Sequence, residues 1–253
     1  MLPKTLTAHI RSLKMKKFRD ELGEFVAEGP KTVSELLESG WEVRNIICTE
    51  DFYKDKEALI NATGAEISIV NDNELKKASN LSTPNKVMAI NAYPTYYTDG
   101  SILKNRFILA LDQIRDPGNL GTVVRTADWF GVNQIVCSND SADIFNPKVI
   151  QSTMGSFLRV RVSYTSLPGF ISENDDYLVL GAFQEGESVY DFEEKKKKIL
   201  VVGNESQGIT REVGSMIERR LTVPSPSGKT ESLNAAVAAS LIMSEFARKK
   251  LLA

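Results

Sequence analysis

Three polar segments of the chain carry the side chains best suited to chemistry, and each follows a short apolar run. They provide Asn119 and Arg125 in residues 112–127, Glu205 in residues 203–208, and Ser232 and Asn234 in residues 223–234. Backbone N–H groups at the start of a helix are unpaired, so a polar loop that leads into a helix can meet a ligand. The five selected side chains therefore predict a binding site with one guanidinium, one carboxylate and three neutral hydrogen-bonding groups.

Plain structural interpretations of these segments stay open. A carboxylate at the end of a strand costs little when it is solvated, so Glu205 can be an ordinary turn acid. The alanine-rich run 235–240 can be a good helix former in a tight α/β interface, or its small side chains can admit an element that packs very close. Three polar tips on one edge of one sheet nevertheless favour a functional site.

Apolar runs of strand length recur after residue 105 and predict the sheet that positions these segments. The expected strands are Phe107–Leu111, Gln134–Cys137, Val160–Tyr164, Tyr177–Gly181, Ile199–Gly203 and a short closing strand that ends at Val223. Helices are expected between them, with Asn119 able to cap one and Ser232 capping the last. This pattern is typical of an α/β fold with a doubly wound parallel sheet, in which ligands bind beyond the carboxyl ends of strands.

The first part of the chain predicts a smaller α/β domain. Residues 1–92 alternate helix and strand patterns, with one helix expected over 4–22 and another over 28–39. Pro, Gly and polar residues then break every period, so we interpret residues 93–104 as a linker and residues 105–253 as a second domain. A turn inside a single domain is the alternative.

The charge distribution is balanced overall and uneven locally. The chain has 31 Lys plus Arg and 33 Asp plus Glu, a formal charge of -2, so overall basicity does not indicate nucleic acid. Residues 1–19 contain basic but no acidic side chains. Such a segment is often a solvated helix face, and contact with RNA or phosphate is the alternative.

The cysteine and histidine content excludes two kinds of site. With two cysteines far apart in sequence and a single histidine, His9, a zinc site and a triad with a histidine base are nearly ruled out. We therefore expect no metal. The sequence also has no apolar run of membrane-spanning length and no signal-peptide pattern, so we expect a cytoplasmic protein that does not enter a membrane.

A phosphate-binding loop is the competing interpretation of residues 223–230. The triplet Gly228-Lys-Thr230 resembles the end of a P-loop, but Val223 occupies the position of the required first glycine. Pro224 and Pro226 also remove backbone N–H donors that such a loop needs. This makes a nucleotide hydrolase a poor interpretation.

Together the three segments resemble the SpoU (TrmH) family of RNA ribose 2′-O-methyltransferases. The matching motifs are Asn119-x-Gly121-x-x-x-Arg125-Thr-Ala127, Gly203-Asn204-Glu205-x-x-Gly208, and Val223-Pro224 through Glu231-Ser232-Leu233-Asn234; Ser152-Thr-Met-Gly155-Ser156 is similar to a further segment of the family. Their order and spacing agree over about 150 residues. The region around Phe25-Val-Ala-Glu-Gly29 resembles the L30e-like substrate-binding domain of many members. The third segment is about one residue longer than usual, which affects the expected shape of the cofactor loop.

The resemblance implies a SPOUT-type domain with a deep trefoil knot, S-adenosylmethionine as cofactor, and a homodimer whose subunits form the active site together. It implies catalytic roles for Arg125, Asn119, Glu205, Ser232 and Asn234, and cofactor contacts at Gly203, Val223, Leu233 and Gly181. The basic amino-terminal segment, with Arg11, Lys14 and Lys17, then becomes a surface for substrate RNA. A small-residue helix after residue 234 is what a threaded segment requires.

The expected function is S-adenosylmethionine-dependent methylation of a ribose 2′-hydroxyl, in ribosomal RNA rather than transfer RNA. Because a guanidinium stays protonated, Arg125 is expected to stabilise the alkoxide instead of acting as a base, and a phosphate of the RNA can assist proton passage. A transfer RNA enzyme and a non-catalytic RNA-binding protein that keeps the fold are the alternatives.

Overall fold

A computed structural model of the 253-residue chain describes residues 2–79, 81, 85–98, 102–228 and 232–252. It separates into two compact units: unit 1 comprises residues 1–98 and 143–158, and unit 2 comprises residues 99–142 and 159–253. The predicted motif residues Lys229, Thr230 and Glu231, and positions 99–101 of the predicted linker, lie outside the described residues. The proposed domain boundaries stay a prediction.

Unit 2 is built on a six-stranded sheet in which all the paired strands are parallel. In spatial order the strands are β10 (Arg219–Thr222), β8 (Leu178–Ser188), β9 (Lys198–Gly203), β5 (Phe107–Asp112), β6 (Gln134–Ser138) and β7 (Arg161–Thr165). Strands β5 and β9 are neighbours in the sheet although three strands lie between them in the chain, with β6 and β7 on the β5 side and β8 and β10 on the β9 side. The loops after these two strands therefore leave the same edge of the sheet side by side, as the sequence predicted.

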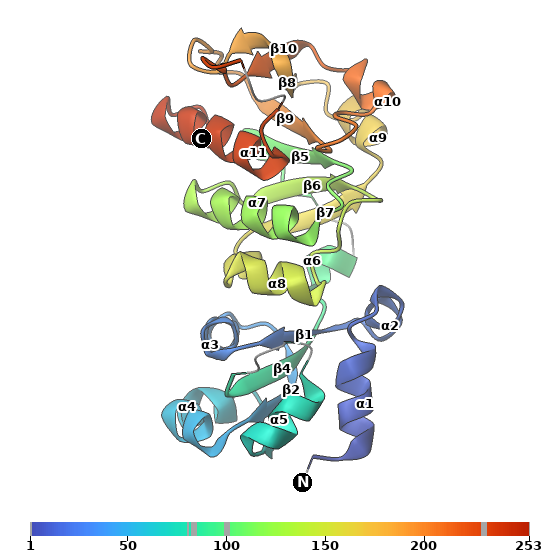
Figure 1. The fold of residues 1–253 in the computed structure, drawn as a ribbon, viewed down its shortest axis with the longest axis vertical. Helices are drawn as coiled ribbons and strands as arrows, with labels where there is room; N and C mark the ends of the chain where they lie inside the picture. Colours follow the sequence, from blue (N-terminus) through green and yellow to red (C-terminus); the bar gives the residue numbers. More distant parts are fainter. Residues whose placement is uncertain (1, 80, 82–84, 99–101, 229–231, 253) are drawn as a thin grey trace. The chain divides into compact units, whose positions relative to one another are not determined.

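Apolar side chains of the central strands point alternately to the two faces of the sheet, and both faces are buried. Ile108 and Ala110 of β5 belong to a core cluster with α9 (Leu167–Ser172) and α10 (Arg211–Gly214). The opposite face of the sheet packs against α11 (Ala235–Arg248), which lies beside α7 (Pro117–Trp129) (Figure 1). Each layer covers one face of the sheet, and this is why strands that read as continuous apolar runs are stable here.

The small side chains of α11 are used for packing. Ala235, Ala236 and Ala239 are buried, and the Ser240 hydroxyl lies 3.2 Å from the Thr126 hydroxyl of α7. Both helices start at the carboxyl edge of the sheet, where the candidate site lies. The structure thus supports the close-packing interpretation of the alanine-rich run.

The helix caps in unit 2 differ from those predicted. Asp116, not Asn119, caps α7, because its side chain accepts a hydrogen bond from the Asn119 amide and Pro117 takes the first helical position. Asn234, not Ser232, caps α11, since its Oδ1 accepts from the amides of Ala236 and Val237. Asp116 directly precedes Pro117, and Asn234 directly precedes the alanine run, so each observed cap is adjacent to the first helical residue.

Unit 1 contains a four-stranded mixed sheet. In spatial order its strands are β1 (Glu24–Glu28), β4 (Val87–Ala92), β2 (Val43–Cys48) and β3 (Glu66–Ile69), with only the β2–β3 pair parallel. Its helices are α1 (Lys4–Ser12), α2 (Lys16–Leu22), α3 (Pro30–Glu38), α4 (Glu50–Ala62), α5 (Asp72–Ala78), the short α6 (Thr95–Thr98), and α8 (Pro147–Thr153) with a 3₁₀ turn at Ser156–Leu158. Side chains of α1 and α5 share one core cluster with β1, β2 and β4.

Two predictions for unit 1 were wrong in detail. The helix expected over 4–22 is broken into α1 and α2, because the Arg19 guanidinium donates to the Leu13 and Lys14 carbonyls, which a continuous helix would use. The helix expected from residue 28 starts only at Pro30 and is preceded by β1. That strand is buried along its whole length and contacts α2, α3 and α8, so it lacks the alternating pattern that identifies a half-buried strand.

The predicted α/β class is confirmed, with a small mixed sheet in the first part of the chain and a six-stranded parallel sheet in the second. The described strand pairings do not by themselves test the trefoil knot, which stays a prediction. None of the described helices is long and apolar enough to cross a membrane.

Candidate active site

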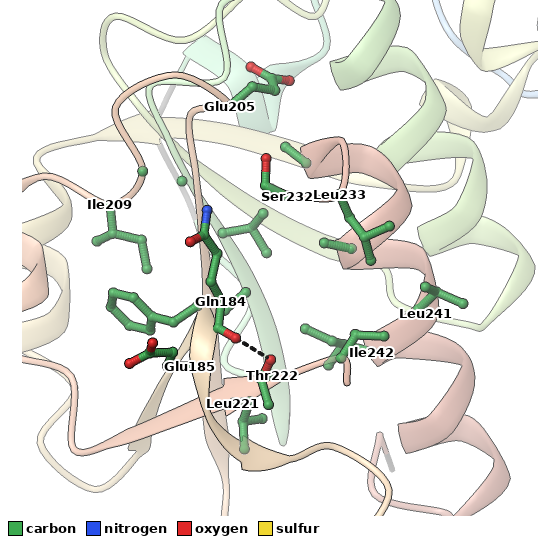
Figure 2. Close-up of a pocket in the computed structure, with 18 of the residues that line it drawn as sticks. Gln184, Glu185, Glu205, Ile209, Leu221, Thr222, Ser232, Leu233, Leu241 and Ile242 are labelled. Atoms are coloured by element: carbon green, nitrogen blue, oxygen red, sulfur yellow. Dashed lines mark hydrogen bonds between the residues drawn. The ribbon is translucent and has the colours of Figure 1, made fainter. Parts of the chain in front are cut away.

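A cleft of about 1250 Å³ opens in unit 2 at the carboxyl ends of β8, β9 and β10. Figure 2 shows its residues: Glu205 and Ser232 lie toward one end, and Leu221 and Thr222 lie toward the other. Leu241 and Ile242 of α11 form a side wall. The predicted motif residues thus form one end of the cleft, and the rest combines apolar side chains such as Ile242 with the polar Gln184 and Glu185.

Most of the predicted cofactor residues line this cleft. Gly203, Val223 and Leu233 are among its lining residues, together with Glu205 and Ser232. Gly181 is not among them, although its neighbour Ala182 is. A Cβ atom on Gly181 would lie 2.5 Å from the ring of Phe183 and close to Ile209 and Ile217. Gly181 thus makes room for the packing of side chains beside the cleft, and we leave it out of the proposed cofactor contacts.

Three predicted catalytic residues form a hydrogen-bonded chain across the three motifs. The Asn234 side-chain amide donates to Asn119 Oδ1 at 3.0 Å, and the Asn119 amide in turn donates to Glu205 Oε1. Asn119 lies in the first turn of α7, Glu205 in the loop after β9, and Asn234 at the start of α11. Because Asn119 accepts from one neighbour, its nitrogen is directed at the carboxylate of the other.

The caps of α7 and α11 explain why this chain is well oriented. Asp116 binds the backbone amide of Asn119, which fixes the first turn of α7. Asn234 uses its Oδ1 as the cap of α11 and its Nδ2 as the donor to Asn119. Both ends of the Asn234 carboxamide are therefore satisfied, and its rotamer is set by the helix that follows. Asp116 was missed as a site residue, although the Asp-Pro pair before Asn119 is a recognisable helix start.

Arg125 is placed differently from the other predicted catalytic residues. It is exposed on α7 and is not among the residues that line the cleft. Within the described part of the chain it makes no hydrogen bond or ion pair that would fix its guanidinium. Nearby on α7, Trp129 is 84% exposed, and Val237 and Leu241 of the adjoining helix α11 are also exposed. Arg125 thus lies on an exposed helical surface with Trp129 and Val237, apart from the residues that line the cleft.

The residues of the cleft fit S-adenosylmethionine. Gly203 packs so closely that a Cβ atom would lie 2.3 Å from the backbone of Gly208 and Ile209, so the loop leaves backbone rather than side chains at this wall. Ile209, Val223 and Leu233 provide accessible apolar surface of the kind that an adenine ring prefers. Glu205 supplies a carboxylate at the polar end, where a positively charged group can be placed. The volume is large enough for a cofactor of this size.

The predicted RNA-contacting residues lie on the surface of unit 1. Lys14 and Lys17 are exposed, and Arg11 is exposed while its guanidinium donates to the Lys77 carbonyl at 2.5 Å. Arg19, in the same basic segment, is instead buried against Asp143. The segment thus separates into exposed basic groups and one structural arginine. Among the described residues, no group of three His, Cys, Asp or Glu side chains is arranged to hold a metal ion.

Comparison with known proteins identifies both parts of the chain. Residues 106–244 match the model of the SpoU rRNA Methylase family, and residues 8–89 match the MRM3-like substrate binding domain. The chain belongs to the SpoU rRNA methylase family. The prediction of an RNA 2′-O-methyltransferase, made from three motifs, is thereby confirmed at the level of the family.

Relatives resemble this SpoU-family chain over almost its whole length. A 23S rRNA guanosine 2′-O-methyltransferase of Bacillus subtilis is 30% identical over 92% of both chains. The structure of a TrmH-family protein from Porphyromonas gingivalis superposes with a TM-score of 0.86 at 33% identity, covering 98% of this chain and 99% of the other. An rRNA methyltransferase of Sinorhizobium meliloti, solved with S-adenosylmethionine bound, has a TM-score of 0.87 at 28% identity and covers 100% of this chain and 97% of its own.

Proposed function

We propose that this protein transfers the methyl group of S-adenosylmethionine to a ribose 2′-hydroxyl of ribosomal RNA, in the large subunit. The observation that carries the proposal is the hydrogen-bonded chain Asn234–Asn119–Glu205 at the polar end of a cleft that suits the cofactor. The relatives support the choice of reaction and RNA, since the Bacillus subtilis protein is named for 2′-O-methylation of 23S rRNA and the Sinorhizobium meliloti protein was solved with the cofactor. Action on ribosomal RNA also favours a cytoplasmic location.

The chain's own residues orient the reacting groups. When bound, S-adenosylmethionine supplies an activated methyl group on a sulfonium. Gly203, Val223 and Leu233 would hold it through backbone groups and apolar contact, with Ser232 closing the polar end. Asn119 and Glu205 present an amide and a carboxylate for the target ribose, and in-line placement of this kind removes much of the entropic cost of reaction.

Arg125 supplies positive charge where the ribose oxygen becomes an alkoxide. The guanidinium is always protonated, so it donates hydrogen bonds to the developing anion and does not remove the proton. We assign the proton to a phosphate oxygen of the RNA substrate, because the candidate site contains no histidine and its carboxylate, Glu205, already accepts a hydrogen bond from Asn119. For this role Arg125 must come close to a cofactor cleft, but within one chain it is not among the residues that line the cleft.

A homodimer resolves this requirement. We propose that the surface of α7 and α11 which exposes Trp129 and Val237 pairs with the same surface of a second copy. A symmetric pairing buries exposed apolar side chains on both chains and brings a second Arg125 into the same interface. The active site would then contain groups from both subunits.

The exposed basic groups of unit 1 provide the RNA contact that precedes catalysis. Arg11, Lys14 and Lys17 lie in the segment that matches the substrate-binding domain. We propose that they bind phosphates of the RNA backbone, which position the substrate without reading its sequence. Ribosomal RNA is favoured over transfer RNA by the relatives, and a non-catalytic RNA-binding protein is disfavoured because the three-residue chain is intact.

Two measurements on the purified protein test this function. Calorimetric titration with S-adenosylmethionine should show saturable binding, and incubation with unmodified 23S rRNA and labelled cofactor should place label in a ribose 2′-O-methyl group. Label in transfer RNA alone would confirm the reaction and overturn the choice of substrate. Cofactor binding without transfer to either RNA would favour the non-catalytic alternative.

A further inference from the structure

The loop that carries Glu205 is closed by two backbone hydrogen bonds between its ends. In residues 204–208 the Asn204 amide donates to the Gly208 carbonyl at 3.0 Å, and the Gly208 amide donates back to the Asn204 carbonyl at 2.8 Å. Gly203 packs directly against the backbone of Gly208 and Ile209. These contacts fix the shape of the loop, and its place beside the neighbouring strand β5 depends on further contacts.

The first tie is the Asn204 side chain, which uses both ends of its carboxamide. Its Oδ1 accepts from the amides of Ser206 and Gln207 at 2.9 and 3.3 Å. Its Nδ2 donates to the Gln113 carbonyl at 3.0 Å, in the segment that leads from β5 to α7. The oxygen shapes the loop around Glu205, and the nitrogen fixes that loop to the segment that ends in Asn119.

The second tie is Asp112, the last residue of β5. Its side chain is 2% exposed and accepts from the backbone amide of Thr210 at 2.7 Å. Asp112 also pairs with Gly203 in the parallel ladder of β5 and β9. Asp112 therefore contacts both ends of the loop, Gly203 where the loop begins and Thr210 just after it ends. Ile209, next to Thr210, lines the cofactor cleft.

We propose that Asn204 and Asp112 are positioning residues that join the second motif to the first. Asn204 places the Glu205 carboxylate within reach of the Asn119 amide, and Asp112 places the cleft wall at Ile209. Asp112 does not line the cleft, and Asn204, which does, has both ends of its carboxamide engaged by the protein. The inference rests on the proposed methyl transfer, and it assigns the two ties to different steps: Asn204 to turnover and Asp112 to cofactor affinity.

Asn204→Asp is the selective test of the first tie. It keeps an oxygen for the Ser206 and Gln207 amides but replaces the donor to Gln113 with a second oxygen that faces a carbonyl. Because small misplacement of a catalytic group is costly, kcat should fall by at least about tenfold. The dissociation constant for S-adenosylmethionine, measured by calorimetry, should change less than about threefold. Amide hydrogen exchange in residues 203–210 should become faster.

Asp112→Ala and Asp112→Asn test the second tie. The alanine variant removes the acceptor for the Thr210 amide and should weaken cofactor binding by about tenfold or more. The asparagine variant retains an oxygen at this position and should restore affinity to near the wild-type value. Melting curves of both variants separate this effect from general unfolding. If the two variants melt at the same temperature but only the asparagine variant binds the cofactor normally, the role of Asp112 is not merely structural.

Asn105→Asp is the matched control. Asn105 lies at the amino-terminal edge of the same sheet, and its Nδ2 donates to Asn133 Oδ1 at 2.6 Å. The variant loses the same kind of donor and should keep wild-type kcat and affinity. Wild-type kcat and exchange in Asn204→Asp, or unchanged cofactor affinity in Asp112→Ala, would overturn the inference. If the wild-type protein binds the cofactor but methylates no RNA, the proposed function fails, while exchange and affinity still decide whether the ties exist.

Discussion

Two arginines show how the two units use positive charge differently. Arg19 of unit 1 is 1% exposed, donates to the Leu13 and Lys14 carbonyls at 2.9 and 2.8 Å, and pairs with the carboxylate of Asp143. Arg125 of unit 2 is exposed, and within the described residues no hydrogen bond or ion pair holds its guanidinium. A fully satisfied, buried arginine stabilises a fold, whereas an exposed and uncommitted one can bind a ligand.

The surroundings of the two arginines extend this contrast. Asp143 lies next to an aromatic cluster in which Phe145 stacks on Phe25 at 4.5 Å and on Tyr93 at 4.6 Å. The Asn234–Asn119–Glu205 chain, by contrast, is exposed at a cleft. The buried network of unit 1 is expected to determine stability, and the exposed network of unit 2 is expected to determine turnover.

Arg19→Ala should have the largest effect, on stability. It leaves the Asp143 carboxylate buried without its partner and frees two carbonyls at the end of α1. Removing one member of a buried pair costs about 3–5 kcal/mol, which urea denaturation measures directly. Lys16→Ala, which removes an exposed pair with Asp20, should cost no more than about 1 kcal/mol. Equal stability of the two variants would contradict the structural role of Arg19.

Arg125→Ala should lower activity and leave stability unchanged, the reverse of what is expected for Arg19→Ala. Loss of a group that stabilises transition-state charge lowers kcat by about 100-fold or more, while the melting temperature and the cofactor dissociation constant stay near wild type. Arg125→Lys should recover only part of the rate because lysine cannot offer a planar pair of donors. Full activity in the alanine variant would remove Arg125 from the mechanism.

Trp129→Ala should weaken the proposed dimer. Truncating a central interface tryptophan typically costs about 2 kcal/mol, and the symmetric dimer loses one on each subunit, so its dissociation constant should rise by at least about 30-fold in sedimentation experiments. Tyr190→Ala, at another exposed aromatic of unit 2, serves as the control and should leave association unchanged. A wild-type protein that sediments as a monomer at all concentrations would refute the pairing.

Charge reversal at Arg11, Lys14 and Lys17 should have the smallest effect on the folded protein and act on RNA binding alone. Each lost phosphate contact should reduce the slope of log affinity against log salt by about 0.7–0.9. Reversal at Lys54 in α4, on the helical layer away from α1, is the matched control. An unchanged slope in the triple variant would place the RNA-binding surface elsewhere.

The sequence predicted the sheet of unit 2 well because its strands are continuous apolar runs separated by helical periods. Phe107–Leu111 and Ile199–Gly203 were placed within one residue of β5 and β9. Their loops could then be assigned to one edge of the sheet from topology alone, which is why Asn119, Glu205 and Asn234 were expected to meet.

Other features depend on contacts that sequence does not display. The break between α1 and α2 follows from the side chain of Arg19, whose partner Asp143 lies 124 residues away. Residues 143–158 belong to unit 1 although the residues on both sides of them belong to unit 2. The ties of Asn204 and Asp112 are likewise side chain to backbone contacts across loops, and such pairs carry no periodic signal.

The most direct test of the central claim is a map of ribose 2′-O-methyl groups on total RNA from cells with and without this gene. The account predicts that one position of the large-subunit ribosomal RNA loses its methyl group, and that wild-type protein restores it while Arg125→Ala does not. A map identical in both cells, together with no S-adenosylmethionine binding by the purified protein, would contradict the account.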